Sequence, residues 1–140
     1  MGNETRHVVG WLALPAMAAA NGALRDATYG KRMGRTAAHS LSVVPLVVTV
    51  LAWAAGLERR WPLASRRAAA RVGVMWLALT LAFEFGMGAA RGTPAREMLA
   101  EYDVRGGHLW PLVPLAVVLA PVLVFRRTAR RKPLGPRLHP

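Results

Sequence analysis

The sequence predicts an all-α membrane protein in which four transmembrane helices form an up-down bundle, with a short amphipathic surface helix between the third and fourth. Hydrophobic residues make up 54% of the 140-residue chain, yet its net charge is +12. The apolar residues gather in four long runs, and the basic residues lie between these runs. Apolar segments in a bilayer and basic loops at its surface explain both properties. The alternative, a soluble bundle, requires a polar face on each helix, and these runs have none.

The predicted spans cover residues 8–24, 36–57, 70–90 and 109–125, and they belong to a single domain over residues 1–125. As helices, their apolar stretches would reach roughly 26–28 Å, close to a hydrocarbon core of about 30 Å. Pro15 and Pro45 lie inside the first two spans, where proline is expected to kink a helix. A cleaved signal peptide ending near Ala18 or Ala20 is the alternative for the first span.

The basic residues predict which side each loop faces. Of the 19 Lys and Arg residues, twelve lie in the N-terminus, the second loop and the C-terminal tail, and seven lie in the first and third loops. The richer side is expected to be cytoplasmic. We therefore expect a multi-pass protein of the bacterial inner membrane with both termini in the cytoplasm. Its second loop and its basic, proline-containing tail over residues 126–140 are expected to attract anionic lipid.

The third loop predicts the surface helix. Thr93 suits the N-cap of a helix and Pro94 its first helical position. Met98, Leu99 and Tyr102 then recur at helical spacing, and Gly106 with Gly107 ends the segment. A plain solvated connector is the alternative.

Glu84 is the most informative residue, because a carboxylate within a membrane span is costly unless it finds a partner or a proton. Thr80, Glu84 and Gly88 share one helix face by their spacing. With the predicted topology, further polar residues lie in the same half of the bundle. The predicted polar site or network comprises Asn21, Arg25, His39, Ser42, Glu84, Tyr102 and Asp103. Arg25 is expected to pair with Glu84, and His39 to bond it or to accept a proton. The other half of the bundle is expected to hold no comparable set.

Several kinds of chemistry receive little support from the sequence. The chain has no cysteine, which excludes disulfides, thiol catalysis and cysteine-ligated metals. Glu84, His39, His108 and Asp103 are metal-ligand types without metal-ligand spacing. We expect no cofactor, no metal, no catalytic residue and no nucleic-acid partner.

The segments NGALRDATYG, AAHSLS, LALTLAFEFGMG, MLAEYDVRGGHLWPLV and LAP resemble a group of small bacterial four-helix integral membrane proteins that have no assigned function. The resemblance covers residues from about 11 to 121. It implies the four-helix topology and implies that the seven polar residues form one set. It implies neither a reaction nor a ligand.

The functional hypothesis is a non-enzymatic membrane protein with an outward-facing polar site around Arg25, His39 and Glu84. This site would bind a small or lipidic ligand or a partner protein, as in an accessory subunit of a larger membrane complex. The alternative is a small proton-coupled transporter that acts as a homodimer with Glu84 as proton carrier. Small multidrug exporters are similar in size and use a membrane-embedded Glu, but theirs is in the first helix. An enzyme using His39 and Glu84 as acid and base is the third hypothesis.

Overall fold

The computed structural model describes residues 1–131, which are mostly helical and contain no strand. The helices are α1 (Asn3–Gly10), α2 (Ala13–Ala27), α3 (Arg35–Arg60), α4 (Arg66–Ala90), α5 (Ala95–Ala100) and α6 (Leu112–Arg131), with a 3-10 turn, η1 (Val104–Gly106), between α5 and α6.

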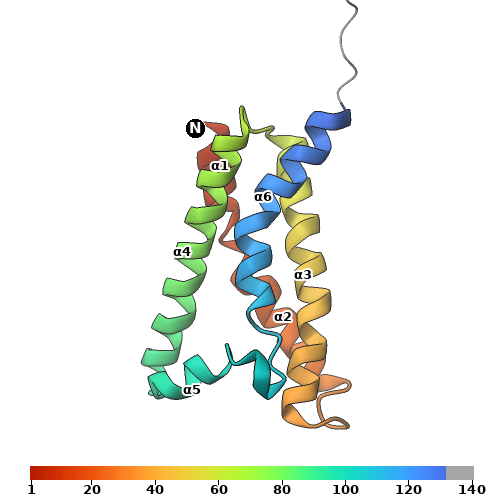
Figure 1. The fold of residues 1–140 in the computed structure, drawn as a ribbon, viewed down its shortest axis with the longest axis vertical. Helices are drawn as coiled ribbons and strands as arrows, with labels where there is room; N and C mark the ends of the chain where they lie inside the picture. The colour runs from red at the N-terminus through yellow and green to blue at the C-terminus, as the bar shows by residue number, and fades with distance from the viewer. Residues whose placement is uncertain (132–140) are drawn as a thin grey trace, which may run out of the picture.

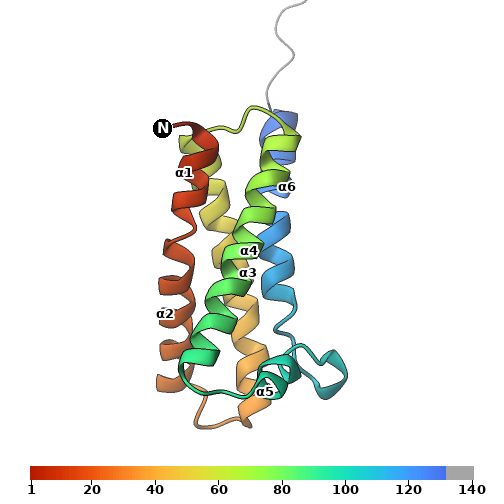
Figure 2. The ribbon, with the colours of Figure 1, turned by 90° about the vertical axis from the view of Figure 1, so that its left-hand side faces the viewer.

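Four long segments lie side by side: α1 with α2, then α3, α4 and α6 (Figure 1). Helix α6 packs against both α3 and α4, while α2 packs on α3 and α1 on α4. The start of α1 and the end of α6 lie at the same end of the molecule, which we call the N-terminal end (Figure 1). At the opposite end, the α5 end, α5 lies between the end of α4 and the start of α6 (Figures 1 and 2).

Each long segment is long and apolar enough to cross a membrane. Only 17% to 33% of the residues in their apolar stretches are buried within the protein. The remainder includes large exposed side chains such as Val44, Val48, Val74 and Leu115. Soluble monomers rarely expose so much apolar surface, so these four helices are consistent with a multi-pass membrane protein.

The first span is broken between α1 and α2, near the predicted kink. Pro15 has no N–H to donate to the carbonyl of Trp11, which accepts from the amide of Leu14 instead. The tightened turn leaves two α1 carbonyls without their usual helical donors. The indole of Trp76 donates to the carbonyl of His7 at 2.8 Å, and that of Trp53 donates to the carbonyl of Gly10 at 2.9 Å. The break therefore anchors α1 to α3 and α4. In contrast, α3 continues through Pro45.

The core contains large side chains from all four segments, including the fully buried Trp76. Helices α4 and α6 approach closely at Gly73, where an added Cβ would collide with the carbonyl oxygen of Val118. Glycine is needed here because the two backbones touch.

Several helices extend beyond the predicted spans. The first helical segment begins at Asn3 rather than residue 8, and α3 continues through Arg60. Helix α6 runs through Arg131, so the predicted tail begins as helix, and residues 132–140 lie outside the described residues. The surface helix α5 is shorter than predicted and starts after Pro94, which replaces Thr93 as the N-cap.

Candidate functional site

Glu84 is held at the α5 end by two neutral hydrogen-bond donors. The Tyr102 hydroxyl donates to Oε2 at 2.8 Å, and the Trp110 indole donates to Oε1 at 2.6 Å. Tyr102 follows α5, and Trp110 precedes α6, so the carboxylate on α4 ties both ends of the α5–α6 connection to the bundle. A carboxylate oxygen accepts more than one hydrogen bond, so Glu84 retains acceptor capacity for a ligand.

The surroundings of Tyr102 reinforce this arrangement. Its ring stacks on Phe85 of α4 with centroids 6.2 Å apart. Burial raises the pKa of the Tyr102 phenol, and donation to Glu84 raises the pKa further because ionisation would place a second negative charge beside the carboxylate. The phenol therefore remains a hydrogen-bond donor across the physiological pH range.

Glu84 borders a cavity of about 290 Å³ that is mostly apolar. Side chains from all four long segments line it, together with Met98 of α5. Thr80, Glu84 and Gly88 all face this cavity, which confirms that they share one helix face. Gly88 leaves room for Met98, whose sulfur would collide with an added Cβ. Thr80 is occupied by the Trp11 indole, which donates to its hydroxyl at 2.9 Å.

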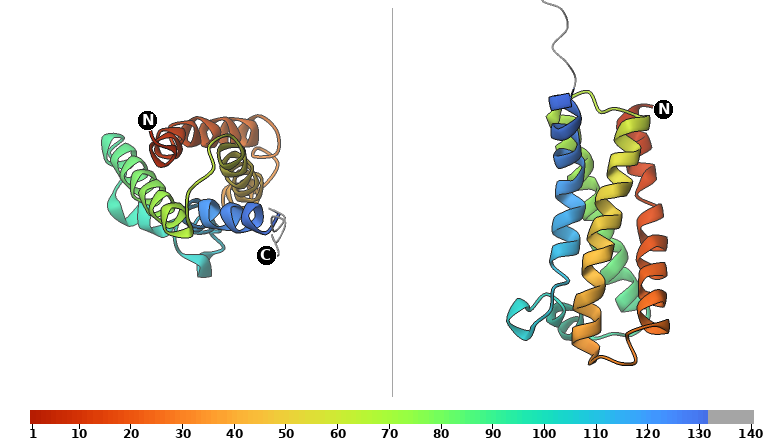
Figure 3. Two further views of the ribbon diagram at one scale, coloured as in Figure 1. Left: turned by 90° about the horizontal axis from the view of Figure 1, so that it is seen from above. Right: turned by 90° about the vertical axis from the view of Figure 1, so that its right-hand side faces the viewer.

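The cavity lies where two segments separate. Helices α2 and α4 diverge toward the α5 end (Figure 1; Figure 3, left). Phe83 and Met87 line the cavity and are also exposed on the outer surface of α4. The cavity thus reaches the apolar surface between α2 and α4. Arg91 and Thr93, at the end of α4, also line it and add polar groups.

His39 lies next to this cluster but is not bonded to Glu84. Its ring is 5.4 Å from that of Trp110, and its Nδ1 is 3.1 Å from Oε2 of Glu101. The Nδ1 of His108 lies 3.3 Å from the same oxygen. Neither approach has hydrogen-bond geometry, and this oxygen is buried without a hydrogen-bond partner in the described chain. The structure therefore groups His39 and His108 around Glu101, and it does not form the acid–base pair of His39 and Glu84.

The expectation that Arg25 pairs with Glu84 is wrong. The Arg25 Nε donates instead to the neighbouring Asp26 at 2.8 Å. Asp26 follows directly in sequence and is exposed, so this pair forms without the cost of bringing a guanidinium into the bundle. Arg25 lines a separate polar hollow with Arg35, His39 and Glu101.

The remaining predicted site residues have local contacts. The Asn21 amide donates to the carbonyl of Ser42 at 2.9 Å and links α2 to α3. The Ser42 hydroxyl donates to the carbonyl of His39, one turn earlier in α3. Asp103 accepts from the backbone N–H of Arg105 and caps η1. Of the seven predicted residues, only Glu84 and Tyr102 bond to each other through side chains.

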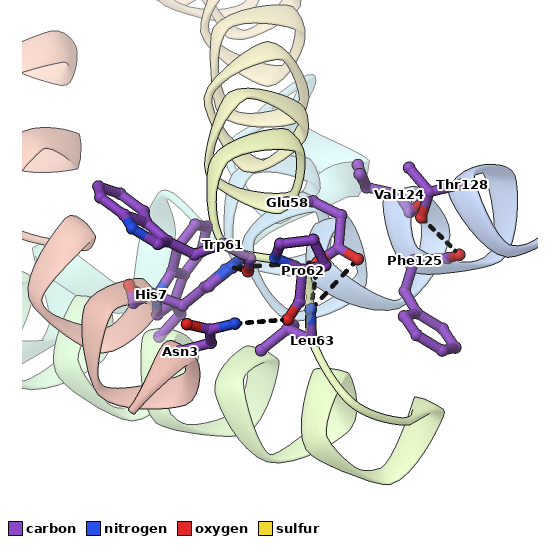
Figure 4. Close-up of polar contacts among 10 residues, drawn as sticks. Asn3, His7, Glu58, Trp61, Pro62, Leu63, Val124, Phe125 and Thr128 are labelled. Atoms are coloured by element: carbon purple, nitrogen blue, oxygen red, sulfur yellow. Dashed lines mark hydrogen bonds and ion pairs between the residues drawn. The ribbon is translucent and has the colours of Figure 1, made fainter. Parts of the chain in front are cut away.

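The N-terminal end holds a buried polar group, so the expectation of no comparable set there is wrong. His7 and Glu58 are 1% and 4% exposed. The His7 Nε2 lies 2.9 Å from the carbonyl oxygen of Trp61, so this nitrogen is the donor. Both carboxylate oxygens of Glu58 accept from the backbone N–H of Leu63 (Figure 4). These hydrogen bonds stabilise the connection between α3 and α4.

Sequence reasoning missed Trp110, Glu101 and the His7–Glu58 group. Trp110 could have been found, because its indole N–H is always a donor and the carboxylate of Glu84 needs one. Glu58 and His7 were hidden because each borders charged residues at the edge of a span, where polar residues are expected in solvent.

Within residues 1–131, no group of three or more His, Asp or Glu side chains is arranged to hold a metal ion. The chain matches no protein-family model, no curated protein and no solved structure.

Proposed function

We propose that the chain is a non-enzymatic, up-down four-helix protein of a bacterial inner membrane that binds a lipidic ligand in the cavity beside Glu84. The proposal rests on one combination of features. The cavity is apolar, it opens sideways between α2 and α4, and it is bordered by a carboxylate that can accept further hydrogen bonds. Ligand sites of proteins commonly have this composition, apolar walls with a few placed polar groups.

The cavity volume limits the ligand. About 290 Å³ lies at the low end of the roughly 300–1,000 Å³ typical of small-molecule sites. One acyl chain or a compact apolar molecule suits this space better than a complete phospholipid. A hydroxyl or ammonium group would bond Glu84, and an acidic group would approach Arg91, whose guanidinium is at the end of α4.

The orientation completes the proposal. Twelve of the 19 basic residues belong to segments at the N-terminal end or to the tail, which favours a cytoplasmic N-terminal end. The cavity would then open in the outer leaflet. This arrangement is compatible with a homodimer. It is also compatible with a larger membrane complex in which the protein serves as an accessory subunit.

The alternative of a proton-coupled transporter receives less support. A proton carried by Glu84 would need a polar route to the N-terminal end. The core between Glu84 and Glu58 is instead occupied by buried apolar side chains, among them Val50, Val72 and Val117.

A matched pair of variants tests ligand binding. Ala18 lines the cavity, whereas Ala19 is exposed on the same helix. A brominated fatty acid should quench the fluorescence of Trp11 and Trp110, which both line the cavity. We expect saturable quenching in the wild type and A19F and its loss in A18F. Equal quenching of both variants, with both folded by circular dichroism, would contradict the proposed site.

A further inference from the structure

A second hollow, at the N-terminal end, combines an apolar wall with two cationic groups. It lies between α1 and α3 and has a volume of about 630 Å³. Val9, Gly10, Trp53 and Leu57 form its apolar part. We call this hollow the α1–α3 groove. Arg6, Arg60 and Trp61 lie at its other end, nearer the end of the bundle.

The two guanidinium groups flank one indole. The Cζ atoms of Arg6 and Arg60 lie 5.5 Å and 5.7 Å from the centroid of the Trp61 ring. Cation–π contacts at such distances hold arginine side chains in place while leaving their N–H donors available. The ion pairs found within residues 1–131 include neither arginine. The nearby Glu4 is already bound to Arg71 at 2.6 Å.

The backbone around this indole is fixed. The Asn3 amide donates to the carbonyl of Pro62 at 2.8 Å, and His7 holds the carbonyl of Trp61 (Figure 4). Gly10 allows α1 to approach α3 closely, since an added Cβ would lie 2.8 Å from Leu57. The floor of the groove is therefore formed before any ligand binds.

We propose that the α1–α3 groove binds one anionic phospholipid, with its phosphate between Arg6 and Arg60 and an acyl chain along Val9 and Trp53. The distribution of groups matches an interfacial lipid: the cations and Trp61 lie toward the end of the bundle, and the apolar wall leads toward the bilayer centre. Guanidinium groups bind phosphate through directed hydrogen bonds. A headgroup with no cation of its own avoids repulsion by the two arginines, which favours anionic over zwitterionic lipid. This site is separate from the cavity beside Glu84.

Native mass spectrometry of the full chain, titrated with phosphatidylglycerol or phosphatidylcholine, tests this inference. We expect one phosphatidylglycerol to bind in preference to phosphatidylcholine, and R6Q/R60Q to raise its Kd about tenfold or more. The control R66Q/R67Q removes the same charge from exposed residues at the same end and outside the groove, and should change the Kd less than about twofold.

Three outcomes would overturn the proposal. Equal weakening in both double variants would indicate bulk electrostatic attraction. Equal binding of the two lipids to the wild type would show that the groove has no specificity for anionic lipid, and this measurement needs no variant. Displacement of the lipid by equimolar glycerol phosphate would identify a site for a soluble phosphate. A18F should retain this lipid, so a failure here is distinguishable from a failure of the cavity beside Glu84.

Discussion

Gly73→Ala should weaken the contact between α4 and α6 and destabilise the protein. The added Cβ would collide with the Val118 carbonyl oxygen and lie 3.1 Å from the carbonyl carbon. These are backbone atoms, so no side chain can rotate away, and overpacking of this kind costs about 1–3 kcal/mol. The better helix propensity of alanine offsets up to about 1 kcal/mol. We expect a net loss of about 1–2 kcal/mol in the free energy of unfolding.

Gly86→Ala is the matched control, because nothing lies within 4 Å of an added Cβ there and the same helix is changed. It should stabilise the protein by about 0.5–1 kcal/mol through helix propensity. Equilibrium unfolding in mixed detergent micelles, followed by circular dichroism, measures both changes. If G73A proved as stable as G86A, the described packing of α4 against α6 would be refuted.

Three further predictions concern Tyr102 at the α5 end and the orientation of the chain. Tyr102→Phe should lower the free energy of unfolding by about 1–2 kcal/mol, because it removes a donor to the half-buried Glu84; an unchanged stability would contradict this bond. In a Tyr29→Phe background, tyrosinate absorbance should not develop near pH 10, the ordinary phenol pKa, until the protein unfolds. Since the folded state retains the proton, the stability from Tyr102 is complete below about pH 10 and falls as the pH rises. The cysteine-free chain also permits labelling of A64C and A100C with an impermeant maleimide: A100C should react from outside intact cells and A64C only after lysis, and the reverse pattern would contradict the orientation.

The helices were predictable from the sequence, but their ends were not. An apolar run indicates only the part of a helix that suits the hydrocarbon core of a bilayer. The helices continue into charged residues such as Arg60 and Arg131, because arginine is a good helix former and needs no apolar surroundings. The break after α1 was predictable from Pro15, since a missing N–H has a local effect. The indole donors that use the freed carbonyls come from distant positions and were not predictable.

The candidate site was predicted in part. Spacing placed Thr80, Glu84 and Gly88 on one face, and the structure places all three at one cavity. The partner of Glu84 was predicted from charge complementarity, which favoured Arg25. The structure instead satisfies the carboxylate with neutral donors, whose selection depends on how the third loop folds back.

Buried polar groups near the edges of spans were the hardest features to recognise. Glu58 stands beside Arg59 and Arg60 in sequence, so the composition of this segment alone indicates a solvated loop. Its burial follows from the turn at Trp61–Leu63, which brings the backbone N–H of Leu63 onto the carboxylate. Pro62 indicates that the helix ends here, but a single-sequence pattern does not show that the turn returns to the Glu58 carboxylate.

Native mass spectrometry of the chain extracted from its own membranes tests whether the cavity beside Glu84 holds a lipidic ligand. Apart from the lipid of the α1–α3 groove, we expect the wild type and A19F to carry one amphipathic molecule of a mass that fits the cavity, and A18F to lack it. If the wild type retained no such molecule, or if A18F retained it equally, the cavity would not be a ligand site.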